Sequence, residues 1–256
     1  MQIKNLENII EGKNAVYESL KGCLAVKCIY VEKLTKDPKI NEIINIAKTK
    51  QVVVKYLTKS ELENLSISKK SQGILAETLD YQYVDVEDII NYAHEKNEPP
   101  FVVVLDEIED PHNFGAIIRT CECAGVHGII IKNRNQVQVT KTVIEISSGA
   151  TSYMKISRCV NISQAIEKLK SYGIFVYASS MEGENIYTSN LTGPIALIIG
   201  NEGKGVSRLV KENADSIIRI PQEGHIDSLN ASVATGVIIY EIYRQRQFFS
   251  KNIATF

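Results

Sequence analysis

Two unbroken apolar runs predict buried strands in the C-terminal part of the chain. Residues 101–105 begin with Phe101 and are rich in β-branched side chains, and residues 195–199 form a second such run. Because a strand inside a parallel sheet is apolar on both faces, these runs favour buried strands. After the first run, apolar residues return at 117, 118, 121 and 124, a spacing that suits a helix packed on a sheet.

Strand patterns and helix patterns alternate from Phe101 onward. Further strands are predicted at residues 128–132, 174–179 and 216–220. Alternation of this kind is typical of α/β proteins, in which helices cover both faces of a parallel sheet. We therefore expect residues 101–256 to form one α/β domain.

The N-terminal part shows shorter elements. Helices are predicted near residues 14–21, 38–48 and 62–65, and strands at 27–31, 52–55 and 73–77. This mixture predicts a small α/β domain over residues 1–77. The next segment, 78–100, is acidic, contains one helix pattern near 86–95 and ends in two prolines, so we predict a linker there.

The formal net charge of −1 hides an uneven distribution along the chain. Residues 1–75 hold thirteen lysines, no arginine and eight acids, a balance of +5. Residues 76–100 hold one lysine and seven acids, a balance of −6. The basic block indicates a nucleic-acid surface, although lysine-rich helix faces also occur without one. Charge alone leaves both interpretations open.

Composition argues against several other classes of protein. No apolar run approaches the roughly 20 residues needed to cross a bilayer. The N-terminus lacks the apolar core of a secretory signal. The five cysteines and four histidines show no metal-ligand spacing. We therefore expect a cytoplasmic protein with reduced thiols, no membrane partner and no metal.

Two helix-initiating segments carry candidate chemistry. Ser228, Asn230 and Ser232 precede an apolar helix and are more cap residues than one helix needs. The segment indicates either a polar ligand at the helix N-terminus or a generously capped helix. Arg119 falls one turn inside the helix that follows the first apolar strand, where α/β proteins place ligands. An ordinary surface charge is the alternative for Arg119.

A glycine-rich loop follows the strand at 195–199 and precedes a helix that begins near Ser207. Its glycines, Gly200, Gly203 and Gly205, let the backbone approach a ligand or adopt positive φ. The spacing excludes a Walker phosphate loop, which needs four residues between its first glycine and the Gly-Lys pair. No G-x-G-x-x-G fingerprint follows any strand, which argues against a dinucleotide site.

Together, residues 105–128, 195–206 and 218–234 resemble motifs one, two and three of the SpoU (TrmH) family of RNA ribose 2′-O-methyltransferases. The whole chain resembles the longer members of this family, which methylate a guanosine of 23S ribosomal RNA. It departs from the family pattern at Ala231, where valine is usual, and Asn201 occupies a variable position. Ser71 replaces a common histidine in the RNA-handling part, which bears on the target more than on the chemistry.

The resemblance implies a fold, a cofactor and partners. We expect a SPOUT-type parallel sheet whose C-terminal segment threads a loop to form a deep trefoil knot. The N-terminal domain is expected to be a ribosomal-protein-like, RNA-binding domain, and the chain to pair as a homodimer through the knotted domain. The loops after residues 179, 199 and 220 are expected to hold S-adenosylmethionine in a bent shape.

The resemblance also implies site residues. The expected cofactor-binding residues are Gly200, Ile220, Leu229, Gly203, Asn230 and Ser232. The expected catalytic residues are Arg119, Asn113, Glu202, Ser228 and Asn230.

Two questions stay open at this point. A guanidinium rarely gives up its proton, so we favour Arg119 as a clamp on the target phosphate, with a phosphate oxygen or water accepting the 2′-hydroxyl proton. The alternative is that a desolvated Arg119 accepts that proton. The target is expected to be 23S ribosomal RNA, with transfer RNA or another ribosomal RNA site as the alternative. A noncatalytic RNA-binding protein of the same fold is disfavoured, because Arg119 and the loop glycines are all present.

Overall fold

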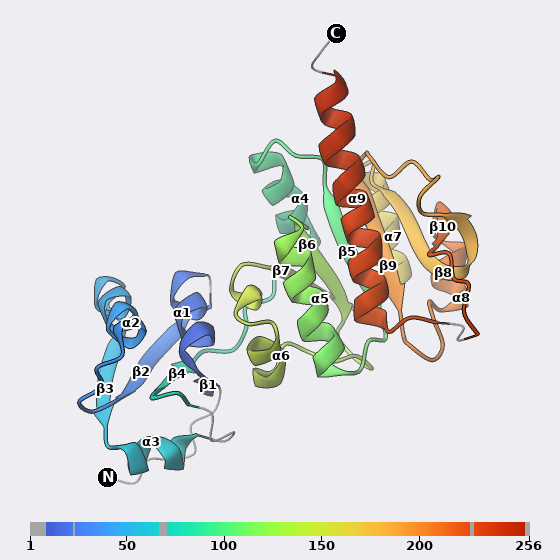
Figure 1. The fold of residues 1–256 in the computed structure, drawn as a ribbon. Coiled ribbons are helices and arrows are strands. Elements are labelled where there is room, and N and C mark those ends of the chain that lie inside the picture. Colours follow the sequence, from blue (N-terminus) through green and yellow to red (C-terminus); the bar gives the residue numbers. More distant parts are fainter. Residues whose placement is uncertain (1–8, 23, 67–70, 226–227, 254–256) are drawn as a thin grey trace. The chain divides into compact units, whose positions relative to one another are not determined.

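The computed structural model describes residues 9–22, 24–66, 71–225 and 228–253. Contacts between residues divide the chain into two compact units. Figure 1 shows their elements, coloured by position in the sequence. Unit 1 contains residues 1–82 and 139–153, and unit 2 contains residues 83–138 and 154–256. None of the helices in the described ranges is long and apolar enough to cross a membrane.

Unit 1 is a small α/β domain, as predicted, built on a four-stranded sheet with the order β1-β4-β2-β3. Strands β2 and β3 are parallel, and the other pairs are antiparallel. Local capping fixes where two of its helices start: Asp37 accepts the N–H groups of Lys39 and Ile40, and Thr58 forms a capping box with Glu61. The elements are β1 (Ile9–Glu11), α1 (Lys13–Lys21), β2 (Val26–Glu32), α2 (Pro38–Thr49), β3 (Val53–Leu57), α3 (Lys59–Leu65) and β4 (Ile74–Thr78).

A segment far along the chain completes unit 1. It contains α6 (Lys141–Ile146) and the 3₁₀ turn η1 (Ala150–Ser152). Ile144 lies in the same apolar core as Ile10 and Ile74. Lys141 forms an ion pair of 2.9 Å with Glu11, whose side chain is only 2% exposed. Unit 1 is therefore held together by contacts across about half of the chain.

The observed division differs from the predicted boundaries in two places. The sequence predicts one continuous domain over residues 101–256, whereas residues 139–153 pack with unit 1. The sequence predicts a linker over residues 78–100, whereas α4 (Val86–Glu95) buries Val86, Ile89 and Ile90 in the core of unit 2. Both differences come from burial of apolar faces against distant elements, which local composition does not encode.

Unit 2 contains a six-stranded sheet with the order β10-β8-β9-β5-β6-β7, and each pair of neighbours is parallel. The predicted parallel α/β fold is therefore confirmed. Strand β8 continues past the predicted end at 179, and β7 is a strand that the sequence did not predict. The strands are β5 (Phe101–Asp106), β6 (Gly128–Lys132), β7 (Lys155–Cys159), β8 (Phe175–Asn185), β9 (Ile195–Gly200) and β10 (Ser216–Arg219).

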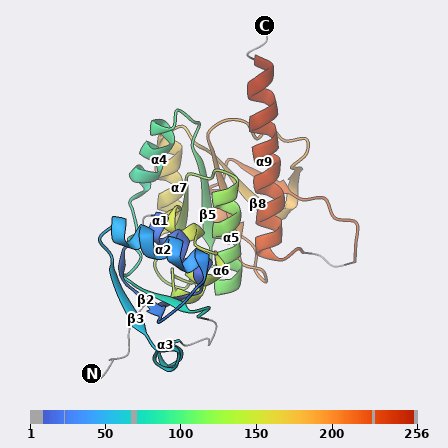
Figure 2. The ribbon, with the colours of Figure 1, turned by 60° about the vertical axis from the view of Figure 1, so that its left-hand side comes forward.

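Helices cover both faces of this sheet (Figures 1 and 2). On one face, Val102 and Val104 of β5 share a core with α4, α7 (Ile162–Ser171) and α8 (Arg208–Glu212). On the other, α5 (Pro111–Cys123) packs beside the long helix α9 (Ala231–Ile253). The alternation of side chains along β5 therefore supplies both cores.

Strands β5 and β9 bring two of the candidate segments together. They pair in parallel, from Phe101 opposite Ile195 to Asp106 opposite Gly200. Because both strands end at the same edge of the sheet, the start of α5 and the glycine-rich loop emerge side by side. Open α/β sheets bind ligands at the carboxyl ends of their strands.

Candidate active site

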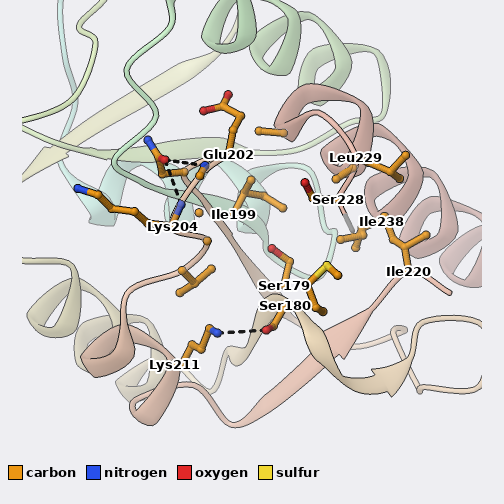
Figure 3. Close-up of a pocket in the computed structure, with 18 of the residues that line it drawn as sticks. Ser179, Ser180, Ile199, Glu202, Lys204, Lys211, Ile220, Ser228, Leu229 and Ile238 are labelled. Carbon is orange, nitrogen blue, oxygen red and sulfur yellow. Dashed lines mark hydrogen bonds between the residues drawn. The ribbon is translucent and has the colours of Figure 1, made fainter. Parts of the chain in front are cut away.

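A cavity of about 350 Å³ lies at this edge of unit 2 (Figure 3). Five parts of the chain form it: the part of β8 beyond its pairing with β9, the glycine-rich loop with the end of β9, Lys211 of α8, the segment after β10, and the start of α9 with the residues just before it. The residues that line it are Ser179, Ser180, Met181, Ile199, Gly200, Asn201, Glu202, Gly203, Lys204, Gly205, Val206, Lys211, Ile220, Gln222, Ser228, Leu229, Ala231, Ala234 and Ile238.

The glycine-rich loop folds tightly back on itself. A Cβ atom on Gly200 would lie 2.1 Å from the carbonyl carbon of Gly205 and from the nitrogen of Val206, so only glycine fits there. Gly205 has a φ of 66°, in the left-handed region that glycine adopts without strain. The expected positive φ is therefore confirmed for Gly205, whereas Gly200 is required by the close approach of the loop to itself.

Asn201 fixes the shape of this loop. Its Oδ1 accepts hydrogen bonds from the N–H groups of Gly203 (2.9 Å) and Lys204 (3.3 Å). Its Nδ2 donates to the carbonyl oxygen of Glu107, 2.9 Å away, at the end of β5. Asn201 thus ties the loop to the neighbouring strand end, a role that the sequence analysis missed.

Side chains of three expected catalytic residues form one hydrogen-bonded chain. Asn113, in the first turn of α5, donates through Nδ2 to Oε1 of Glu202. Asn230 donates through Nδ2 to Oδ1 of Asn113 at 2.9 Å. The structure therefore brings together one residue from each of the three sequence motifs.

Asn230 also caps α9. Its Oδ1 accepts the N–H groups of Ser232 (2.9 Å) and Val233 (3.3 Å) and the hydroxyl of Ser232 (2.6 Å). Satisfying the free N–H groups of the first turn in this way is what an N-cap does. The capped-helix interpretation of this segment is thus correct, and it leaves the amide of Asn230 directed at Asn113.

With respect to the cavity, the expected site residues fall into two groups. Gly200, Gly203, Ile220 and Leu229, expected to bind the cofactor, line the cavity, as do Glu202 and Ser228. Asn113, Asn230, Ser232 and Arg119 are not among the residues that line it. Arg119 is exposed on α5, about 9 Å along the helix axis from Asn113 at 1.5 Å per residue.

The sequence analysis missed several lining residues. Lys211 of α8 donates a 3.1 Å hydrogen bond from Nζ to Oγ of Ser180. Ile238 reaches the cavity from the second turn of α9. A surface lysine and an apolar helix residue carry no local signal of a site. Ser180 was not predicted by itself, although it follows residue 179, where the family resemblance places one of the cofactor loops.

Charged and apolar side chains are segregated in the cavity. Figure 3 shows Glu202 and Lys211 on opposite sides, with Ser179 between them, and Ile220, Leu229 and Ile238 gathered along another wall. Such a site suits a ligand with an apolar ring and charged groups of both signs. Within the described ranges, no three His, Cys, Asp or Glu side chains are grouped so that they could hold a metal ion.

Comparisons with known proteins agree on one family. Residues 100–240 match the SpoU rRNA methylase family, and residues 9–84 match RNA 2′-O ribose methyltransferase substrate-binding domains. A Bacillus subtilis (strain 168) relative, named as the TrmH family tRNA/rRNA methyltransferase YacO, is 39% identical over 237 residues. That alignment covers 92% of this chain and 94% of the relative.

Two solved structures share the fold. One is AviRb from Streptomyces viridochromogenes, a SpoU methyltransferase in complex with the cofactor AdoMet, with 20% identity, a TM-score of 0.78 and coverage of 94% of this chain and 90% of that one. The other is an AdoMet-bound rRNA methyltransferase from Sinorhizobium meliloti, with 24% identity, a TM-score of 0.78 and coverage of 93% and 87%. The family match extends over more than half of the chain, and the chain therefore belongs to the SpoU family of RNA methyltransferases.

Proposed function

We propose that this protein transfers a methyl group from S-adenosylmethionine to the 2′-hydroxyl of a ribose in RNA. The observation that carries the proposal is the cavity at the strand ends, bordered by the chain Glu202–Asn113–Asn230. Its volume falls in the range of small-molecule sites. Both solved structures described above contain AdoMet, which is S-adenosylmethionine.

The residues present fit this cofactor. Ile199, Ile220, Leu229 and Ile238 offer an apolar wall for an adenine ring. Glu202 can face the positive charges of the cofactor, and Lys211 can face its carboxylate. Backbone atoms of the glycine-rich loop can approach a ligand closely at Gly203, which carries no side chain and has open space around it. We assign cofactor binding to Gly200, Gly203, Ile220 and Leu229, with Asn230 and Ser232 shaping the start of α9.

When bound, the cofactor supplies an electrophilic methyl group on sulfur. The chain's own residues then have to hold the ribose oxygen in line with it and stabilise the charge that develops on that oxygen. Asn113 and Asn230 hold each other and Glu202 in fixed orientations beside the cavity. Ser228 lines the cavity and is exposed, so its hydroxyl can reach the ribose.

Arg119 is assigned to the RNA side of the site. It is exposed on α5 and does not line the cavity, which suits a contact with a substrate phosphate rather than with the cofactor. We favour a clamp, since a guanidinium binds phosphate with two parallel hydrogen bonds and holds its proton tightly. Proton acceptance by Arg119 itself stays the alternative.

The RNA substrate is proposed to be 23S ribosomal RNA, methylated at a guanosine, with unit 1 binding the RNA. The match of residues 9–84 to substrate-binding domains supports the role of unit 1, as does its excess of lysine. The Bacillus subtilis relative is named for both tRNA and rRNA, so transfer RNA is the alternative target.

Two structural features implied by family membership complete the proposal: a trefoil knot at the C-terminus of unit 2 and a homodimer formed through this unit. Support for the dimer comes from α9, where large apolar side chains are exposed on a helix of 23 residues. They are Val233, Tyr240, Tyr243 and Phe248. Exposed apolar patches of this kind mark interaction surfaces.

Two measurements test the proposed function. Calorimetry should show one S-adenosylmethionine site per chain, unaffected by EDTA. Absence of binding at millimolar ligand would contradict the assignment of this cofactor. Mapping of 2′-O-methyl groups in 23S ribosomal and transfer RNA, from cells with and without the gene, should identify the target. A protein that binds RNA while no methylated position depends on it would be a noncatalytic member of the family.

A further inference from the structure

A second concave surface lies at the same edge of unit 2, formed by the loop that follows β6. Its lining consists of Lys132, Asn133, Arg134, Asn135 and Val160. We name this surface the β6 hollow.

The backbone of the β6 hollow is fixed on both sides. The N–H of Asn133 donates to the carbonyl of Cys159 at the end of β7 (2.9 Å). The N–H of Val137 donates to the carbonyl of Ile108 in the segment that connects β5 to α5 (3.0 Å). Gln138 adds a side-chain bond from Nε2 to the carbonyl of Lys132 at 2.9 Å. The exposed side chains of this loop are therefore presented from an ordered support.

A lysine of the β6 hollow and a lysine of the cofactor cavity both act on Glu107. Lys132 pairs with Glu107 at 2.8 Å and holds the pKa of that carboxyl below its usual range, with a smaller contribution from Lys204. Lys204 itself lines the cofactor cavity. Two lysines that come from different strand ends thus act on one carboxylate.

Arg134 has no such neutralising partner. It is exposed, and no ion pair is recorded for it within the part of the chain that the structure describes. None of the described residues that line the β6 hollow is a carboxylate. Arg134 lies between two asparagines in the sequence, and all three side chains are exposed. They can offer several hydrogen-bond donors to one oxyanion, a combination that favours phosphate.

We propose that the β6 hollow binds a backbone phosphate of the RNA substrate, next to the nucleotide whose ribose enters the active site. This proposal rests on the proposed function and extends it, because it assigns an RNA contact to unit 2 that neither Arg119 nor unit 1 supplies. Arg134, Asn133 and Asn135 donate to the phosphate. Val160, which is 79% exposed, offers an apolar surface to the adjoining sugar or base. Contacts of this kind orient a strand without reading its sequence.

The test compares binding of deproteinised 23S ribosomal RNA, from cells that lack the gene, by the full chain and by Arg134→Gln. The variant should bind roughly fivefold more weakly, and its slope of log affinity against log salt should be smaller by about 0.7 to 0.9. Arg134→Lys should keep the slope, because the charge remains. Lys168→Gln removes a cation from α7, where Lys168 pairs with Glu87, and should change neither quantity.

Two further readouts separate this proposal from a general loss of structure or activity. Affinity for S-adenosylmethionine should be equal in wild type and Arg134→Gln, and the KM for RNA should rise while kcat stays unchanged. Wild-type affinity and salt slope in Arg134→Gln would overturn the phosphate site. If the wild-type protein binds RNA but not S-adenosylmethionine, the proposed function is wrong. The phosphate site is then still tested, because RNA binding by wild type and by Arg134→Gln can be compared without the cofactor.

Discussion

The side-chain amide of Asn230 donates to Asn113 while its carbonyl oxygen caps α9, so one residue joins the starts of two helices. The two halves of this role can be separated. Asn230→Asp keeps an acceptor for the N–H groups of Ser232 and Val233 but has no hydrogen to donate to Asn113. Stability should therefore stay near wild type, whereas methyl transfer should fall.

Asn230→Ala removes both the cap of α9 and the hydrogen bond to Asn113. It should lower the free energy of unfolding by about 1 kcal/mol through loss of the cap, and it should also reduce cofactor affinity and turnover. Urea unfolding and single-turnover assays on both variants measure these effects. Equal activity of Asn230→Asp and wild type would show that the contact with Asn113 does not serve catalysis.

Gly200 and Gly203 form a matched pair of variants within one loop. A Cβ on Gly200 would collide with the backbone at Gly205 and Val206, whereas a Cβ on Gly203 meets only Oδ1 of Asn201, at 3.5 Å. Gly200→Ala should therefore displace the loop and weaken S-adenosylmethionine binding by at least tenfold, a cost of about 1.4 kcal/mol. Gly203→Ala should bind within a few-fold of wild type. Calorimetry measures the affinity of each variant for S-adenosylmethionine. Equal affinities for the two variants would show that close packing of the loop at Gly200 is not needed for cofactor binding.

Much of unit 2 could be predicted because its strands carry their own signal. The apolar runs predict β5 and β9 to within one residue, since a strand buried on both faces has little polar sequence. Strand β7 (Lys155–Cys159) was missed, because it lies at the edge of the sheet and mixes polar with apolar residues.

Contacts between distant segments could not be predicted in the same way. Nothing local in residues 139–153 indicates that Ile144 packs with Ile10. The chain Glu202–Asn113–Asn230 joins residues up to 117 positions apart, and only the resemblance to a family singled them out together. Lys211 was missed because its bond to Ser180 depends on how α8 meets β8.

The ion pair between Lys141 and Glu11 should stabilise unit 1 strongly. Its side chains are 21% and 2% exposed, so Lys141→Met leaves a buried carboxylate without its cation. We expect a loss of about 2 to 3 kcal/mol, somewhat below the range for a fully buried pair. Faster hydrogen exchange over residues 139–153 should accompany this loss of stability.

Lys39→Met is the control, because it breaks a more exposed pair with Glu42, and it should lower the free energy of unfolding by less than about 1 kcal/mol. Equal losses in the two variants would argue against a structural role for the Lys141 pair.

His127 should make the stability of unit 2 depend on pH. Burial lowers the pKa of His127 below 6.5, against the opposing effect of Glu98. Its Nδ1 accepts the N–H of Phe101 at 3.0 Å, which requires the neutral ring. A folded pKa below the unfolded value means that the stabilising contribution is present above about pH 6.5 and is lost as pH falls through the folded pKa.

His127→Gln should therefore flatten the decline in unfolding free energy between pH 7 and pH 5. The exposed His94→Gln variant should leave that decline as in wild type, and an unchanged decline in His127→Gln would assign it to other groups.

Arg119 should separate catalysis from cofactor binding. Because it is exposed on α5 and does not line the cavity, Arg119→Ala should keep wild-type affinity for S-adenosylmethionine. Loss of one electrostatic clamp raises a reaction barrier by on the order of 3 kcal/mol, so methyl transfer in a single turnover should fall by roughly two orders of magnitude.

Arg119→Lys should recover little of this rate, since an ammonium is a point charge and cannot form two parallel hydrogen bonds to phosphate. Arg208→Ala, at an exposed arginine of α8 that pairs with Glu212, is the control and should retain activity. Near wild-type single-turnover rates in Arg119→Ala would show that the catalytic centre lies elsewhere on unit 2.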